Sequence, residues 1–438
     1  WPHKKYFCFF VHLLLTNGAI LIFVVTLILY GVNKFSMGTV GMITMAALLV
    51  TGCLAPKDAL GYFANKNVIL MLSMFVVSAG LSRTTFLDAF SDTIVKLAKG
   101  SFKRTYLCYI VMAVILTNLL SSPLVVFTIL LPLVDSMCKR YEISPSKVMF
   151  PIGLCCVACC CIMPFGAAIG QSALYSGFLE SYGYDIAFTP LDFFKGRWPF
   201  LLIVPAWAFT MGYKIAPEKP ITDVASVVVS GKTKQKLNKF ADIAGVVIFF
   251  GVVVLCCVSD KIGVETWVIC LVGAVLDLVC GVLTSKEAIA ALPVSLACML
   301  IGSLAMAGAL TATGAGDVIG GFLSNVVGGM NNAYALGAVF FLLPFILTQF
   351  MQNQAVMAMF VPICLMACRN LNANPLGFMV LITAGSLTAF MTPMATSCIP
   401  AVMGAGGYDI KSLVKQGILP SAIFAVIYIF YTMTVMPV

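Results

Sequence analysis

Polar residues interrupt two long apolar runs of this chain, and their types suit the binding of a small anion. The first patch is Thr117–Asn118 with Ser121–Ser122–Pro123, and the second is Thr348–Gln349 with Gln352–Asn353–Gln354. Each patch precedes an apolar stretch that ends at a proline. Hydroxyl and amide groups donate hydrogen bonds to oxyanions, so Ser122 and Asn353 are candidate ligands. For Ser121–Ser122–Pro123 taken alone, a simple helix kink is the competing interpretation.

A second pair of interruptions contains proline beside small or hydroxyl residues. It comprises Pro164–Phe165–Gly166–Ala167 in the run 148–178 and Thr392–Pro393–Met394–Ala395–Thr396–Ser397 in the run 375–406. Proline removes a helical hydrogen bond, so both runs are predicted to be broken helices. A half-helix that begins at a break offers backbone N–H groups to an anion, and one that ends there offers carbonyls to Na⁺.

The composition indicates that these breaks lie inside a membrane. Of the 438 residues, 61% are hydrophobic and 10% are charged, and the mean hydropathy is +1.04. Soluble domains have about 25% charged residues, which excludes a soluble enzyme, a nucleic-acid binder and a disordered chain. The length allows about ten crossings of roughly 20 residues each. The net charge of +9 is expected to mark cytoplasmic loops, since Lys and Arg concentrate there.

The chain contains one unit twice. GCLAPKDA (52–59) recurs as GVLTSKEA (281–288), an offset of 281 − 52 = 229 residues, and TNLLSSPLVVFTILLP (117–132) matches TQFMQNQAVMAMFVP (348–362). We therefore predict an all-α polytopic membrane protein with a first repeat at 1–213, a cytoplasmic linker at 214–242 and a second repeat at 243–438.

Each repeat is predicted to have about five membrane-spanning helices and one re-entrant hairpin. The hairpins are expected at 105–137 and 333–368, and each follows a surface helix, at 85–104 and 315–332. An odd number of crossings requires the second repeat to be inverted. Charge agrees, because 83–104 contains five basic residues whereas 313–332 contains none.

Ionisable groups and cysteines give weaker signals. Asp277 is the clearest charged residue within a span, and we expect it to be structural or to snorkel, so Na⁺ coupling is favoured over proton coupling. The chain has 17 cysteines, mostly in apolar runs such as CCVACCC (155–161), where they are expected to pack. Cys156 and Cys159 have metal-binding spacing, but adjacent cysteines are expected to point apart, and no metal site, cofactor or catalytic residue is predicted.

At these residues the chain resembles the divalent-anion/sodium symporter family of the ion transporter superfamily. The similar parts are the hairpin tips, FMTPMATS (390–397), the surface helix before each hairpin and GGYDIKSLVKQGILP (406–420). The family has Ser-Asn-Thr at each tip. Asn353 keeps the central Asn, and Ser122 replaces it in the first repeat. The second family motif, roughly Thr-Pro-Pro-Asn, is here Ala395–Thr396–Ser397–Cys398, whereas Gly166–Ala167–Ala168 lacks the hydroxyl.

The resemblance implies a homodimer in which a scaffold domain holds the partner and a transport domain with both hairpins moves as an elevator. The residues and the resemblance together give the candidate sites. The predicted substrate ligands are Ser122, Pro123, Ala167, Gln352, Asn353, Gln354, Thr396 and Ser397. The predicted Na⁺ ligands are Ser121, Ser122, Gly166, Asn353, Thr392 and Ala395.

The predicted function is sodium-coupled symport of a small di- or tricarboxylate or a similar divalent anion, in the inner membrane of a bacterium. Two alternative functions are those of other transporters in the same superfamily. One is an efflux permease for arsenite or another oxyanion, and the other is a proton-coupled anion transporter. A channel and a membrane scaffold are alternatives of another class. The expected partners are the anion, Na⁺, the lipid bilayer and a second copy of the chain, with no nucleic acid.

Overall fold

The computed structural model is helical throughout the part that it describes. That part comprises residues 2–32, 34–86, 89, 101–120, 122–222, 237–258, 262–316, 318–319, 332–350, 352–392, 396 and 398–437, and no strand occurs in it. By length and composition, six of the described helices are able to cross a membrane, and seven shorter apolar helices accompany them. The predicted all-α polytopic fold is confirmed.

The first half begins with four helices: α1 (Pro2–Val32), α2 (Met37–Val50), α3 (Pro56–Phe63) and α4 (Lys66–Arg83). A hairpin and a broken helix follow: α6 (Phe102–Leu119), α7 (Pro123–Tyr141), α8 (Met149–Ala158) and α9 (Ala167–Ser181). The last elements are α10 (Pro190–Arg197), α11 (Phe200–Trp207), a π-helical turn (Ala208–Gly212) and α12 (Tyr213–Ile215).

The second half repeats this order. Its helices are α13 (Lys239–Cys257), α15 (Thr266–Val279), α16 (Ser285–Ala291), α17 (Val294–Ala312), α19 (Ala333–Thr348), α20 (Asn353–Leu371), α21 (Leu376–Leu387), α22 (Cys398–Gly406) and α23 (Ile410–Val435). Helix α15 begins 266 − 37 = 229 residues after α2, and α16 begins 285 − 56 = 229 residues after α3. The repeat boundaries at 213 and 243 stay a prediction. Most of 85–104, 315–332 and the linker lies outside the described residues.

Helices of the first half pack against helices of the second half. Helix α2 packs against α17, and α15 packs against α4, so each half contributes one member of each pair. Gly41 and Gly302 permit the first contact, because a Cβ atom on Gly41 would lie 2.5 Å from the carbonyl oxygen of Cys298. A Cβ atom on Gly302 would in turn meet the backbone of Gly41. Small residues of this kind allow helix backbones to approach closely inside a membrane.

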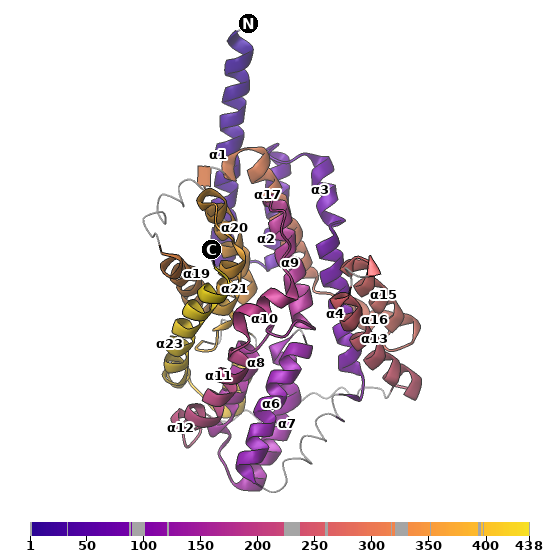
Figure 1. Cartoon of the computed structure of the whole chain (residues 1–438), viewed down its shortest axis with the longest axis vertical. Coiled ribbons are helices and arrows are strands. Elements are labelled where there is room, and N and C mark those ends of the chain that lie inside the picture. The colour runs from indigo at the N-terminus through magenta and orange to yellow at the C-terminus, as the bar shows by residue number, and fades with distance from the viewer. Residues whose placement is uncertain are drawn as a thin grey trace.

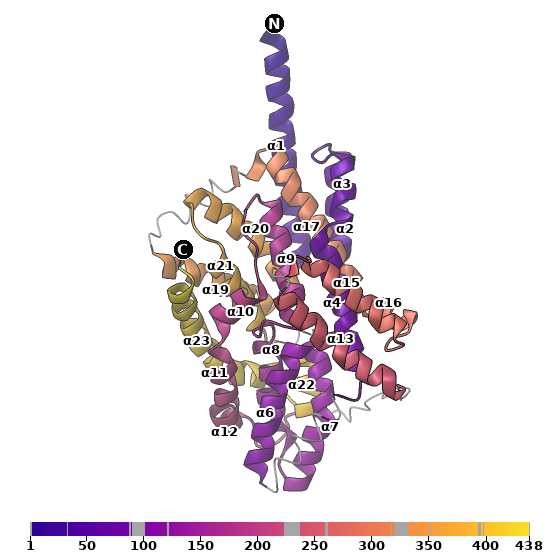
Figure 2. The same ribbon diagram turned by 45° about the vertical axis from the view of Figure 1, so that its right-hand side comes forward.

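The hairpins lie toward opposite ends of the molecule. Figures 1 and 2 both show α6 and α7 at the lower end and α20 in the upper part. Helix α6 ends at Leu119 and α7 starts at Pro123, whereas α19 ends at Thr348 and α20 starts at Asn353. The broken helices also match the prediction. The break between α8 and α9 contains Pro164, and the break between α21 and α22 lies between Leu387 and Cys398.

Asp277 does not snorkel. Its side chain is fully buried near the end of α15, where it packs against Gly80 of α4. Of the two roles expected for Asp277, the structure matches the structural one, because α4 covers that face of α15. Asp277 therefore belongs to the contact between the halves and does not line the cavity described below.

One ion pair at the end of α4 gives a pH-dependent prediction. Arg83 Nε lies 2.9 Å from Glu287 Oε1, and Glu287 Oε2 accepts hydrogen bonds from the backbone N–H and the hydroxyl of Thr284. The backbone N–H of Thr284 contributes most to a lowered pKa of Glu287, and the Thr284 hydroxyl and Arg83 add to it against the opposing effect of burial. A carboxyl whose folded-state pKa is lowered stabilises the fold above its unfolded-state pKa.

We therefore expect Glu287→Gln to unfold at a lower temperature than the wild type at pH 7. The difference should shrink as the pH falls below about 4.3, the usual pKa of Glu, because the wild-type carboxyl then becomes protonated. The effect is expected to stay below about 1 kcal/mol, since the pair is partly exposed. Thermal unfolding in detergent across pH 3.5–7 measures it, with the exposed Glu218→Gln as control. An identical pH profile for the wild type and Glu287→Gln would contradict the prediction.

Candidate functional site

Three of the described helices begin at one cavity of about 430 Å³, and a fourth begins two residues after a residue that lines it. Pro123, Ala167 and Asn353 are the first residues of α7, α9 and α20, and all three line the cavity. Thr396 also lines it, two residues before α22 begins at Cys398. The N-terminus of a helix has unpaired N–H groups and a partial positive charge, and both favour an anion. The two hairpins and the two broken helices therefore direct four favourable ends to one place.

Threonines at the hairpin tips fasten each hairpin to its broken helix. The hydroxyl of Thr117 donates to the carbonyl of Cys156 at 2.6 Å. In the second half, the hydroxyl of Thr348 donates to the carbonyl of Ser386 at 3.0 Å. The same residue type makes the same kind of contact in both halves, and both threonine side chains are fully buried. These threonines are therefore braces behind the site.

The amides that follow these threonines strengthen the same contact. The Oδ1 atom of Asn118 accepts hydrogen bonds from the backbone N–H groups of Ile162 and Met163, at 3.0 and 2.8 Å. The Nε2 atom of Gln349 donates to the carbonyl of Thr388 at 3.1 Å. Both amides thus satisfy backbone groups that the breaks leave without helical partners. Asn118 and Gln349 therefore stabilise the non-helical backbone of the breaks, and neither residue lines the cavity.

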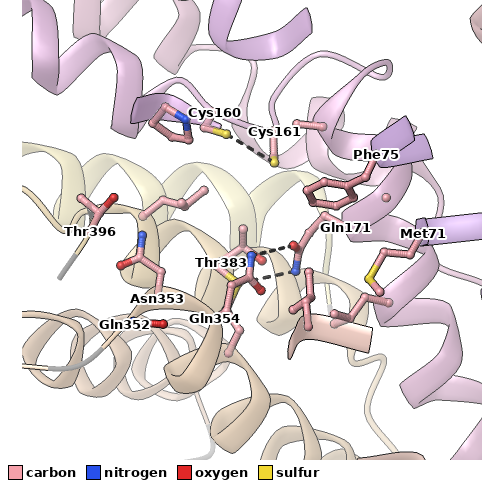
Figure 3. Close-up of a pocket in the computed structure, with 17 residues that line it drawn as sticks. Met71, Phe75, Cys160, Cys161, Gln171, Gln352, Asn353, Gln354, Thr383 and Thr396 are labelled. Carbon is pink, nitrogen blue, oxygen red and sulfur yellow. Dashed lines mark hydrogen bonds between the residues drawn. The ribbon is translucent and has the colours of Figure 1, made fainter. Parts of the chain in front are cut away.

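Neutral polar side chains from both halves meet in the cavity (Figure 3). The Nε2 atom of Gln354 donates to Oε1 of Gln171 at 3.2 Å, which joins α20 to α9. The Oε1 atom of Gln354 is buried and has no hydrogen-bond partner among the described residues. Thr383 bonds to the hydroxyl of Tyr175, with 2.6 Å between the oxygens. The Oδ1 atom of Asn353 lies 2.9 Å from the hydroxyl oxygen of Thr348, whose single hydrogen is shared between Asn353 and the carbonyl of Ser386.

The other side of the cavity is apolar and comes from different helices. Met71 and Phe75 belong to α4, and Leu296 belongs to α17. The cavity therefore lies between the hairpins with their broken helices and the helices that precede each hairpin. Among the described residues, none that lines the cavity is charged.

A buried arginine lies directly behind one wall. Arg197, the last residue of α10, is fully buried, and its guanidinium donates to the carbonyls of Ala158, Cys160 and Cys161 at 3.1, 3.1 and 3.4 Å. Its Nε atom lies 3.4 Å from the hydroxyl of Tyr428. Among the described residues, Arg197 forms no ion pair with a carboxylate. Arg197 therefore places a positive charge at the C-terminal end of α8, where the helix dipole favours it.

The turn held by Arg197 corrects the expectation that adjacent cysteines point apart. Cys161 has a left-handed backbone with φ 55°, and this conformation turns the side chains of Cys160 and Cys161 toward each other. Their sulfur atoms lie 3.6 Å apart, and both residues line the cavity (Figure 3). The expectation assumed regular backbone, which the break after α8 does not have.

The structure brings most of the predicted substrate ligands together. Pro123, Ala167, Gln352, Asn353, Gln354 and Thr396 line the cavity. Ser122 caps α7 through the backbone N–H of Val125 at 3.5 Å and is not part of the lining. Ser397 lies outside the described residues, as do Ser121 and Ala395 of the predicted Na⁺ ligands. That these residues bind substrate or ion stays a prediction.

Two of the predicted Na⁺ ligands also have a structural role in the fold. Gly166 forms the turn before α9, with φ 59°. Thr392 donates its hydroxyl hydrogen bond to the carbonyl of Gln349, which ties the second break to the second hairpin. Gln171, Thr383, Cys160, Cys161 and the apolar residues of α4 were not predicted to line the site. Gln171 was detectable as a lone amide within an apolar run.

Two family models together cover nearly the whole chain. The model described as "Citrate transporter" matches residues 19–260, and the model described as "Sodium:sulfate symporter transmembrane region" matches residues 199–437. Each match spans more than half of the chain. The chain belongs to the divalent-anion/sodium symporter family. It is therefore a multi-pass membrane protein from a family of transporters, and these matches are to transporters rather than to enzymes.

Curated relatives of this symporter-family chain are described as transporters. An uncharacterized transporter of Synechocystis is 27% identical over 219 residues, which is 48% of this chain and 35% of the relative. An uncharacterized transporter of Escherichia coli is 27% identical over 128 residues, 29% of this chain and 21% of the relative. The chain thus spans about a third or less of the length of these relatives.

Two solved structures share the fold of this symporter-family chain. The YdaH transporter of Alcanivorax borkumensis, which has an unusual topology, aligns with a TM-score of 0.61 at 12% identity and covers 97% of both chains. MtrF of Neisseria gonorrhoeae, from a class of antimetabolite efflux pumps, aligns with a TM-score of 0.58 at 12% identity over 93% of this chain and 96% of MtrF. At such low identity these alignments establish the fold alone.

Proposed function

We propose that this chain is a secondary transporter that carries a small divalent anion, a di- or tricarboxylate or a sulfate-like oxyanion, together with Na⁺. The observation that supports it best is the convergence of four helix N-termini on one uncharged cavity. Such a site attracts an anion without a fixed cationic side chain in contact with it, so that release does not require breaking an ion pair.

The side chains in the cavity support an anion as the cargo. Gln171, Asn353 and Gln354 offer amide groups, and Thr383 and Thr396 offer hydroxyls. Amide N–H and hydroxyl groups bind carboxylate, sulfate and similar oxyanions through the same hydrogen bonds. Arg197 adds a positive charge behind the wall, separated from the cavity by the peptide groups of Cys160 and Cys161. We propose that this charge increases the preference for anions over neutral solutes.

Sodium is the proposed coupling ion because the site offers oxygen ligands and no titratable carboxylate. The lining residues that the structure describes contain neither Asp, Glu nor His, so none of them is suited to carry a coupling proton. The buried Oε1 atom of Gln354, which lines the cavity, lacks a hydrogen-bond partner among the described residues. Amide and carbonyl oxygens are suitable ligands for Na⁺ near a helix break. The proposed ion ligands remain Ser121, Ser122, Gly166, Asn353, Thr392 and Ala395.

The position of the cavity favours an elevator mechanism in a homodimer. The apolar side formed by α4 and α17 belongs to the helices that interlock the two halves, which suits a stationary scaffold. The polar side belongs to the hairpins and broken helices, which are braced to one another by Thr117, Asn118, Thr348 and Gln349. A braced group of this kind would move as one body along the apolar wall.

A thermal-shift measurement tests the proposal through Asn353→Ala. A ligand that binds the native state stabilises it by RT ln(1 + [L]/Kd). We expect citrate, succinate or sulfate to raise the unfolding temperature of the wild type in NaCl and not in choline chloride. Loss of the Asn353 amide is expected to weaken binding by roughly tenfold, about 1.4 kcal/mol.

Asn370→Ala is the matched control, because Asn370 lies on the same helix and donates to the carbonyl of Met366, away from the cavity. Its response should equal that of the wild type. Equal stabilisation in sodium and choline would overturn Na⁺ coupling. Absence of stabilisation by every anion tested would overturn the anion site itself.

A further inference from the structure

We propose that Cys160 and Cys161 form a vicinal dithiol on the cavity wall that binds a trivalent thiophilic centre, with an organic monoarsonous acid as the typical ligand. This inference goes beyond the proposed function, because it concerns covalent capture by two side chains and holds whatever anion the chain carries. It follows from three observations: the distance between the sulfurs, the backbone that fixes it, and the position of both residues at the cavity.

The distance between the sulfurs fits one shared central atom. Thiolate sulfur lies about 2.3 Å from a soft tetrahedral centre such as zinc, so two sulfurs on one centre lie roughly 3.8 Å apart. The sulfurs of Cys160 and Cys161 are 3.6 Å apart. A pyramidal arsenic atom has a slightly narrower angle between its bonds and needs a slightly shorter separation. The pair is therefore positioned for capture with little movement.

The backbone holds the pair in this position. In extended or helical backbone, adjacent side chains diverge, and only the left-handed conformation of Cys161 brings these two together. The guanidinium of Arg197 donates to the carbonyls of both residues, so the turn is fixed by a buried, charged hydrogen-bond donor. A preorganised pair loses little conformational freedom when it binds.

The capture step balances without an oxidant or a reductant. A monoarsonous acid, R–As(OH)₂, reacts with the two thiols to form two As–S bonds. The two As–O bonds break, and each hydroxyl leaves as water with one thiol proton. Arsenic stays trivalent, and both sulfurs stay in the thiol oxidation state. A dithiol supplied in excess reverses the reaction by exchange.

Two other close cysteine pairs among the described residues provide internal comparisons. The sulfurs of Cys256 and Cys270 are 3.7 Å apart, and those of Cys364 and Cys368 are 3.9 Å apart. Neither pair lines the cavity. Cys256→Ser and Cys364→Ser together remove one thiol from each, and this double variant is the background for the experiment.

The experiment measures arsenic bound per chain after phenylarsine oxide, which forms the monoarsonous acid in water, is added to the purified protein. Gel filtration with 2-mercaptoethanol removes adducts to single thiols before arsenic is determined. We expect about one arsenic per chain in the background variant, and complete release by excess 2,3-dimercaptopropanol. Adding Cys160→Ser or Cys161→Ser should abolish retention, whereas Cys159→Ser, at a buried neighbour whose thiol contacts the carbonyl of Phe200, should keep it.

Retention that persists in both Cys160→Ser and Cys161→Ser overturns the proposal, and so does loss in Cys159→Ser. If a serine variant does not yield folded protein by gel filtration, Cys160→Ala and Cys161→Ala replace it, with the same expected loss. The readout is independent of transport. A failure of anion binding in the thermal-shift experiment therefore leaves this result interpretable, and the converse also holds.

Discussion

Replacing Gly166 with alanine is expected to destabilise the chain by about 3–5 kcal/mol, from a strained backbone combined with a steric clash. Gly166 has φ 59° and ψ −118°, which side chains other than glycine rarely adopt. A Cβ atom there would lie 2.7 Å from the carbonyl oxygen of Leu119 and would also overlap that of Asn118. Because these carbonyls belong to the tip of the first hairpin, the clash separates the hairpin from the broken helix that it braces.

Gly170→Ala is the matched control. Gly170 lies one turn further along α9 and also lines the cavity, but a Cβ atom there would meet only Phe75, at 3.9 Å. This variant is expected to be neutral or more stable by up to about 1 kcal/mol, since alanine favours helix over glycine. Thermal and denaturant unfolding in detergent compare the two. Equal stability of Gly166→Ala and Gly170→Ala would mean that the turn tolerates a side chain and that its geometry is not decisive.

Replacing Arg197 with methionine is expected to cost about 3–5 kcal/mol, because buried polar groups lose their partners. The carbonyls of Ala158, Cys160 and Cys161 would be left in an apolar interior without this donor. The positive charge behind the cavity would also disappear. We therefore expect both a lower unfolding temperature and weaker stabilisation by citrate or sulfate.

Arg197→Lys separates geometry from charge. Lysine keeps the charge but lacks the planar guanidinium that reaches three carbonyls at once, so stability should fall while the anion response is largely retained. Lys195→Met, two residues away with an exposed side chain, should stay within about 0.5 kcal/mol of the wild type. If citrate or sulfate raises the unfolding temperature of Arg197→Met as much as that of the wild type, each relative to its own value without anion, the charge has no role in anion binding.

The sequence allowed the helices that form the cavity to be predicted because their signals are local. Proline and polar residues within apolar runs marked the starts of α7 and α20 and the breaks after α8 and α21. The recurrence of GCLAPKDA as GVLTSKEA marked the offset at which α3 and α16 repeat. A proline removes a hydrogen bond of its own helix, and a polar N-cap residue starts the helix that follows it. Cause and structural effect therefore lie within a few residues of each other in the sequence.

The remaining features depend on contacts that no local pattern encodes. Gln171 meets Gln354, which is 183 residues away, and Arg197 pairs with backbone carbonyls that every residue has. The left-handed backbone of Cys161 has no sequence signature, because that conformation is usually found at glycine. Thr117 and Asn118 belong to the first polar patch, but their hydrogen-bond partners on the broken helix, which give them a structural role, lie about 40 residues away in the sequence.

The contacts between the halves also affect how the protein is made. Gly41 leaves the ribosome 302 − 41 = 261 residues before Gly302, its partner across the contact of α2 with α17. At about 5–20 residues per second, α2 waits roughly 13–50 s for its partner helix. The contact of α4 with α15 is likewise delayed until the second half is synthesised. During this interval, the face of α2 that contains Gly41 lacks the helix that packs against it in the finished protein. Slow translation of the second half prolongs this interval.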